Sequence, residues 1–104
     1  MAKYLLAYHG GRMAETDEER NAVLAAWGEW FQKAGGAIKD PGNPVGQSRT
    51  ISNGSVVQGG GANPLSGYSI VEAESIDGAV ELARGCPVLQ NGGSIEVAET
   101  FDVM

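Results

Sequence analysis

The chain contains one histidine, His9, which is the first candidate for acid–base chemistry. Imidazole is the side-chain group that ordinarily changes charge near neutral pH, so it serves as a general base in many enzymes. Either Glu72 or Glu96 would orient the ring if the fold brings it close. The alternative is a strand-end histidine that only hydrogen-bonds to the backbone of a loop. We take His9 as the predicted catalytic residue and keep the structural alternative open.

A second set of residues suits the binding of a ligand. Arg49 is the only charged residue in positions 41–71, and a planar guanidinium can hold a carboxylate with two hydrogen bonds. Tyr68 and Glu72 fall on one face of a predicted strand, as does Glu96 of a second strand. We therefore predict ligand binding by Arg49, Tyr68 and Glu72. A solvated or intersubunit salt bridge for Arg49, and rim positions for the other two, are the alternatives.

The remaining reactive groups favour neither a metal nor a cofactor. One cysteine, Cys86, excludes an internal disulfide and a metal site made of cysteines alone. Cys86 follows a predicted helix, whose C-terminal dipole raises the pKa of a thiol, so we expect a buried packing residue and not a nucleophile. His9 and the carboxylates lack the spacing of metal ligands. Residues 59–61 are glycines without the Gly-Lys-Ser/Thr of a phosphate-binding loop.

Charge and length restrict the class of protein. Seven basic against thirteen acidic residues give a net charge of −6, which argues against nucleic acid or an anionic membrane as partner. No apolar run approaches the ~20 residues that span a bilayer. The N-terminal residues lack the length and cleavage region of a signal peptide, so we expect a cytoplasmic protein. A chain of 104 residues predicts a single domain over residues 1–104.

The most distinct predicted element is a helix after an initial strand at residues 3–9. Thr16 to Glu19 form a capping box, in which each end residue satisfies a free backbone N–H of the helix start. Gly35-Gly36 ends the helix. Its apolar residues repeat at helical spacing and form one stripe: Val23, Leu24, Trp27, Trp30, Phe31 and Ala34. We assign the aromatic members to the core, with a ligand-binding wall as the alternative.

The second half of the chain predicts a hairpin, two strands and a short helix. Asn53-Gly54, between residues 49–52 and 55–58, is typical of a two-residue hairpin turn. Residues 67–74 read as a strand with Ser69, Val71 and Ala73 on one face. A helix starting at Ser75 or Asp77 ends before Gly85. A last strand covers residues 94–99.

This order predicts a ferredoxin-like α+β fold, β-α-β-β-α-β, with an antiparallel sheet and an extra hairpin in the middle connection. Both helices would then cover one face of the sheet. We expect the other face to carry Tyr4, Leu6, Tyr8, Tyr68 and Ile70. Such a face is too apolar to leave in water, so we predict a homodimer in which a partner sheet covers it.

Several short motifs resemble the YCII-related (DGPF) domain family. Gly67-Tyr68 at the start of a strand, Ala79, Cys86-Pro87 and residues 93–97 (Gly-Ser-Ile-Glu-Val) are similar to its C-terminal half. Lys3-Tyr-Leu-Leu-Ala-Tyr8 and the helix with two tryptophans resemble its first half, so the resemblance covers nearly the whole chain. It implies a dimeric α+β barrel, in which two ferredoxin-like sheets pack face to face.

The enzymatic residues of that family are not carried over. In its enzymatic branch, a dehydrochlorinase-like activity is attributed to a histidine in the first helix and an aspartate before the proline that follows the second helix. Here the first helix has no histidine, and Cys86 precedes Pro87. Residues 58–61 (Gln-Gly-Gly-Gly) replace the DGPF tetrapeptide. The resemblance therefore implies the fold and the dimer, but not this catalytic pair.

Two functions follow from the sequence. The first is a small homodimer that binds a small organic molecule in a barrel pocket, with lyase- or isomerase-type chemistry and His9 as base. The second is a non-catalytic accessory or regulatory module that keeps the fold without the catalytic pair. Whether the protein is an enzyme stays open, and neither hypothesis calls for a cofactor or a metal.

Overall fold

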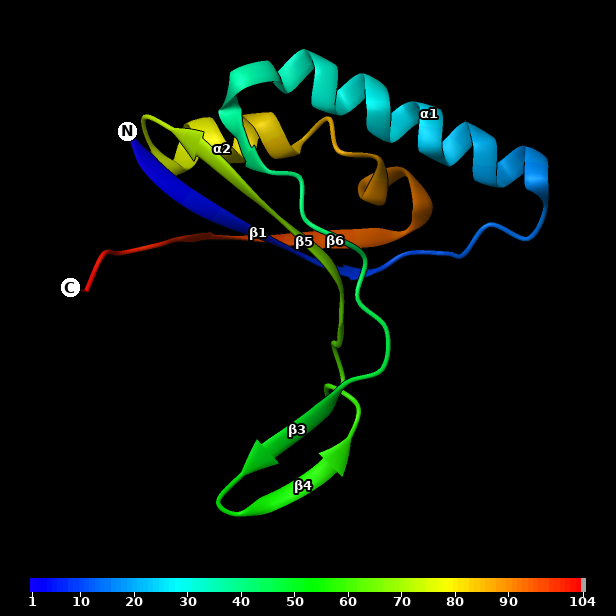
Figure 1. Cartoon of the computed structure of the whole chain (residues 1–104), viewed down its shortest axis with the longest axis vertical. Helices are drawn as coiled ribbons and strands as arrows, with labels where there is room; N and C mark the ends of the chain where they lie inside the picture. The colour runs from blue at the N-terminus through cyan, green and yellow to red at the C-terminus, as the bar shows by residue number, and fades with distance from the viewer. Residues whose placement is uncertain (104) are drawn as a thin grey trace.

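The computed structural model describes residues 1–103, which form a mixed α+β fold with two α-helices and antiparallel sheets (Figure 1). The strands are β1 (Ala2–Gly10), β2 (Ile38–Asp40), β3 (Arg49–Ser52), β4 (Ser55–Gln58), β5 (Leu65–Ala73) and β6 (Gly93–Glu99). The helices are α1 (Asp17–Ala34) and α2 (Ile76–Ala83), followed by the short 3₁₀ turns η1 (Gly35–Ala37) and η2 (Pro87–Asn91).

The main sheet has the strand order β2-β5-β1-β6, so β1 lies in its middle between β5 and β6. Both of these neighbours run antiparallel to β1. Strands β3 and β4 form a separate two-stranded sheet. Figure 1 shows both helices on one side of the main sheet and the β3–β4 hairpin projecting on the other side.

Helix α1 begins as its sequence predicts. The Thr16 hydroxyl accepts a hydrogen bond from the Glu19 N–H at 3.1 Å, and the Glu19 carboxylate accepts one from the Glu15 N–H at 2.9 Å. Thr16 thus satisfies a backbone donor that the first turn leaves free, and Glu19 ties down the residue before the N-cap. The predicted apolar stripe is correct at Trp30, which is buried, but wrong at Leu24, which is 63% exposed.

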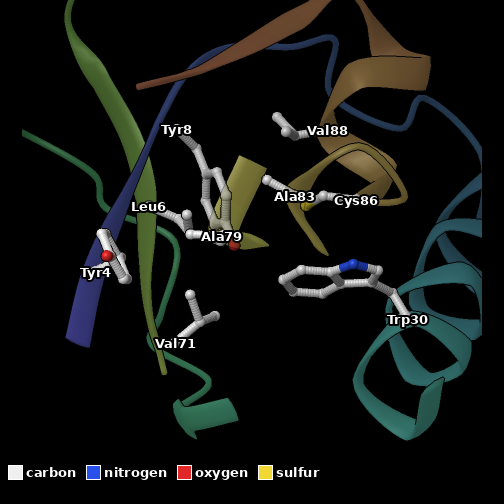
Figure 2. Close-up of a cluster of buried hydrophobic side chains, with 9 residues drawn as sticks. All are labelled: Tyr4, Leu6, Tyr8, Trp30, Val71, Ala79, Ala83, Cys86 and Val88. Atoms are coloured by element: carbon white, nitrogen blue, oxygen red, sulfur yellow. The ribbon is translucent and has the colours of Figure 1, made fainter. Parts of the chain in front are cut away.

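The core lies between the main sheet and the two helices. Figure 2 shows Leu6 and Tyr8 of β1 extending toward Ala79 of α2, and Tyr4 belongs to the same buried cluster, together with Trp30 of α1. The prediction that these three side chains lie on the face away from the helices is therefore wrong. Tyr4, Leu6 and Tyr8 are opposite Val71, Ser69 and Gly67 of β5 and occupy the helix-covered face.

The face of the main sheet without helices is called the open face below. Alternation along the strands assigns it these residues: Lys3, Leu5, Ala7 and His9 of β1; Tyr68, Ile70 and Glu72 of β5; Ser94, Glu96 and Ala98 of β6. The predicted positions of Tyr68 and Ile70 on this face are correct. Leu5 and Ala7 take the places that the sequence analysis gave to Tyr4, Leu6 and Tyr8.

The aromatic side chains of α1 pack among themselves and against β1. The Trp27 ring lies edge-on to the rings of Tyr8 and Trp30, with centroids 5.4 and 5.8 Å apart. The Trp30 indole N–H donates to the Leu82 carbonyl at 2.9 Å, which joins α1 to α2. These contacts support the core assignment of the aromatic stripe, with Trp30 buried and Trp27 and Phe31 partly buried against the core.

The segment from β2 to Pro44 lies against β5 and carries a strand that the sequence analysis did not locate. Ile38 pairs with Val71, and Pro44 forms an isolated bridge to Gly67. Gly42 lies so close to β5 that a Cβ atom there would be 1.7 Å from the Tyr68 carbonyl oxygen, and its φ is +72°. Only glycine allows the chain to pass at this point.

The β3–β4 hairpin, residues 49–58, is called the arm below. Its two strands and the Asn53-Gly54 turn coincide with the prediction, and both turn residues have positive φ, 51° and 81°. All residues of both strands are exposed. The radius of gyration is 14.9 Å, whereas a compact chain of this length has a value of about 13 Å. The arm thus extends away from the rest of the chain.

Replacement of Leu6 tests the corrected orientation of β1. Leu6 is fully buried, so Leu6→Ala should lower the free energy of unfolding by about 2–5 kcal/mol. Leu24→Ala removes the same atoms from an exposed position and should change it by less than about 0.5 kcal/mol. Urea unfolding followed by tryptophan fluorescence measures both. Equal effects of the two substitutions would contradict the orientation described here.

Candidate functional site

His9 lies near the end of the central strand β1, on the open face, and is 8% exposed. Its Nδ1 atom is 3.0 Å from the Asn63 carbonyl oxygen and 3.2 Å from that of Pro64. Carbonyl oxygens only accept hydrogen bonds, so the proton of a neutral ring belongs on Nδ1. Nε2 then carries the lone pair.

The loop at residues 59–64 reaches His9 because of the way in which the start of β5 pairs with β1. Gly59 and Gly61 have positive φ values of 87° and 82°, which allow the chain to turn back from the arm toward the sheet. His9 pairs with Leu65, and the register shifts between Tyr8 and His9. The two residues before Leu65 therefore present their carbonyl oxygens to the imidazole.

The other ring nitrogen faces a carboxylate. Nε2 of His9 is 3.4 Å from Oε1 of Glu96, whose side chain is 70% exposed while that of His9 is 10% exposed. Nε2 itself is buried and has no hydrogen-bond partner within the described residues. A protonated ring would donate Nδ1–H to the loop and attract Glu96 through Nε2–H. The pair can thus hold a proton, and Glu96 is its member in contact with solvent.

The structure brings only part of the predicted site together. Tyr68 is opposite Ala7 on the open face, on the side of Ala7 that is away from Glu96. Glu96, Ala7 and Tyr68 therefore form a row across three strands, next to His9 along β1. Ala7, the middle residue of this row, is buried between its two larger neighbours.

Glu72 lies too far from His9 to orient it. It is opposite Lys3, six residues along β1 from His9, a separation of about 20 Å. Its Oε1 atom is 3.4 Å from Nζ of Lys39 in an ion pair. Of the two carboxylates that the sequence offered as partners of His9, the structure selects Glu96.

Arg49 also lies apart from His9, at the base of the arm opposite Gln58. Among residues 1–103, its guanidinium has no carboxylate within 4.0 Å. Within one chain, Arg49 therefore forms no ion pair with Glu96.

Cys86 is a core residue. It is fully buried in the cluster of Figure 2, and burial raises the pKa of its thiol. Tyr8, in the same cluster, donates a hydrogen bond to the Ser69 hydroxyl at 2.7 Å, and that hydroxyl donates to the Pro41 carbonyl at 2.7 Å. Burial raises the pKa of Tyr8 strongly. Both groups are held protonated, which argues against Cys86 as a nucleophile.

Other kinds of site find no support in residues 1–103. No three histidine, cysteine or acidic side chains gather there as metal ligands require. Neither helix in this range has the length and apolar character needed to cross a membrane. Two surface hollows lie away from His9, one on α1 beside Glu29 and one between α2 and β6 beside Leu89.

The sequence reasoning identified His9 but could not identify the groups that fix its ring. The carbonyl oxygens of Asn63 and Pro64 belong to the backbone, so no side-chain pattern marks them. The one sequence feature that could have indicated this contact was the glycine-rich loop that precedes β5, the strand that pairs with β1. Comparison of the sequence with protein-family models and with curated proteins finds no match.

Alkaline pH should destabilise the protein through the two buried acids. The pKa values of Cys86 and Tyr8 are raised above their ordinary values of 9.0 and 10.0. Their protonation therefore contributes stability in full below pH 9, and this contribution is lost as the pH rises toward the folded-state values.

Unfolding by urea between pH 7 and 10.5 measures this loss. Cys86→Ala should lower the free energy of unfolding by roughly 1 kcal/mol at pH 7. Above pH 9, the free energy of unfolding of this variant should fall less steeply than that of the parent protein. Parallel curves for the two proteins would show that Cys86 does not retain its proton on folding. Rapid alkylation of the native thiol at neutral pH would also contradict its burial.

Proposed function

We propose that the protein is a homodimer that binds a small organic acid between two open faces, where Glu96 and His9 exchange a proton with it. One observation carries the proposal: the buried Nε2 of His9 has no hydrogen-bond partner within the described residues and lies 3.4 Å from the exposed carboxylate of Glu96. The pair lies on the sheet face that no helix covers. A structural histidine needs only the loop carbonyls on Nδ1, and Nε2 would be left unpaired at a cost.

The architecture of this proposal is that of a ferredoxin-like domain in a dimeric α+β barrel, as the resemblance to YCII-related proteins implies. Two features support it. The strand order β2-β5-β1-β6 with helices on one face suits that fold. Leu5, Ala7, Ile70 and Ala98 leave an apolar open face that a second sheet would remove from water.

The chemistry that this pair supports is transfer of a proton from carbon. Glu96 takes the proton from the carbon next to a carboxyl or carbonyl group, and His9 Nε2 receives it from Glu96. In an isomerisation the proton returns to a different carbon of the ligand. In an elimination the electron pair of the broken C–H bond forms a double bond and expels a leaving group with its own pair.

Exchange of hydrogen for deuterium tests this chemistry without knowledge of the substrate. A panel of short-chain and aromatic acids in D2O, followed by proton NMR, should include a compound whose C–H signal disappears with the protein. Glu96→Gln and His9→Gln should each lower that rate by about 10²-fold or more. Glu81→Gln is the matched control, because Glu81 is paired with Arg84 at α2 on the other side of the sheet, and should retain the rate.

The second candidate, a non-catalytic module, is favoured by the two carbonyl contacts of His9, which fasten the loop at residues 63–64 to β1. A non-catalytic module would bind a compound without exchanging the compound's C–H hydrogen for deuterium. If a compound shifts the NMR signals of Glu96 but retains its own C–H signal in D2O, the result would support the non-catalytic module and contradict the catalytic proposal.

The dimer has its own test. Light scattering during gel filtration should give twice the chain mass for the parent at micromolar concentration. Ile70→Glu places a charge in the middle of the open face and should give a monomer, since burial of an unpaired carboxylate is costly. Leu24→Glu, on the exposed side of α1, is the control and should remain dimeric. A monomeric parent protein would contradict the proposal.

A further inference from the structure

The arm is a regular hairpin whose two strands, among residues 1–103, pair only with each other. A two-stranded hairpin alone is marginally stable in water and normally packs against a third element. Yet Ile51, Val56 and Val57 are 75%, 60% and 57% exposed. Three apolar side chains on a ten-residue projection indicate a surface that is covered in the functional state.

The two faces of the arm differ in character. Ile51 is directly opposite Val56, and Arg49 and Gln58 lie on the same face because alternate residues of a strand share a side. The other face carries Thr50 opposite Val57 and two serines. We call the first of these, with Ile51, Val56 and Arg49, the apolar face of the arm.

The position of the arm limits what can cover it. The arm leaves the main sheet beside the start of β5 and projects on the side away from both helices (Figure 1). This is the side of the open face. A body that packs on the open face would therefore lie next to the arm and could contact both surfaces at once.

The charges of the two surfaces are complementary. The chain carries −6 overall, yet Arg49 is the only charged residue in positions 41–71. The open face carries Glu96, whose side chain is 70% exposed. A second copy would thus offer a carboxylate where the arm offers its one cation, and apolar sheet residues where the arm offers Ile51 and Val56.

We propose that the arm of each chain packs against the part of a second copy's open face around Glu96, while the facing sheet covers the rest, with the arm's apolar face inward and Arg49 beside the partner's Glu96. The contact is reciprocal, because the same two surfaces meet twice about a two-fold axis. Arg49 then completes the acid–base site in trans, as the cation that holds the carboxylate of a bound organic acid. This inference rests on the proposed homodimer and adds to it which segment crosses between subunits.

Isotope-filtered NMR on a mixed dimer tests the contact directly. One half of the sample carries ¹³C-labelled methyl groups and the other half is unlabelled. Ile51 and Val56 methyls should show nuclear Overhauser effects to protons of the unlabelled chain. If such effects appear for Leu5 and Ile70 but not for the arm, the dimer stands and the arm proposal fails. If they appear for neither, the dimer itself fails.

Matched substitutions on the two faces of the arm measure its contribution to assembly. Ile51→Ser, on the apolar face, should raise the dimer dissociation constant about tenfold or more, as for a buried interface residue. Val57→Ser removes a similar side chain from the opposite face and should change it less than about threefold. Hairpin chemical shifts of both variants show whether the arm itself remains folded, and equal effects of the two variants would overturn the assigned face.

Substitutions of Arg49 supply the final test. They separate the packing of the arm in the dimer from the role of Arg49 in the partner's acid–base site. Arg49→Glu should weaken the dimer and abolish binding of the organic acid found by deuterium exchange, while Arg49→Lys should retain the dimer and weaken binding only in part. Mixing Arg49→Glu with Glu96→Gln chains forms heterodimers in which one of the two sites has both native residues. Equal mixing makes about half of the dimers heterodimers, so recovery of about a quarter of the parental exchange would confirm assembly in trans, and no recovery would exclude it.

Discussion

Strand β1 is apolar on both faces, and the chain has helices to cover only one. Leu6 and Tyr8 are removed from water by Trp30 and the small residues of α2, while Leu5 remains half-buried on the other side. A strand in the middle of an antiparallel sheet cannot turn both faces toward the same layer. The open face, on which His9 lies, follows from this one-sided coverage.

Local sequence signals predicted the elements well, because their causes are local. The capping box at Thr16 and the Asn53-Gly54 turn each depend on a few neighbouring residues, and both occur as predicted. The orientation of β1 was not predictable in this way. Residues 4–8 do not alternate between apolar and polar side chains. The sequence pattern therefore does not distinguish the two possible assignments of these residues to the faces of the sheet, which differ by a shift of one residue. Packing on Trp30 selects the larger side chains for the core.

The candidate site shows a similar division between residue type and environment. A single histidine followed by two glycines was enough to single out His9, but its environment depends on pairing at a distance in sequence. Glu96 reaches it because β6 pairs with β1, and the Asn63 carbonyl reaches it because β5 begins opposite His9. Strand β2, three residues long and identified by its pairing with Val71, was missed for the same reason.

The loop at residues 59–64 has two roles that the fold cannot separate. Its first residue closes the base of the arm, where the Gly59 N–H donates to the Ser48 carbonyl at 2.8 Å, and its last two supply the acceptors for His9. The base of the arm and the acceptors of His9 are thus joined by a single segment of six residues. In the proposed dimer, a ligand that binds only between two open faces would stabilise the dimer by an amount that grows with the ratio of ligand concentration to dissociation constant, and dimerisation would in turn strengthen ligand binding, since linkage is reciprocal.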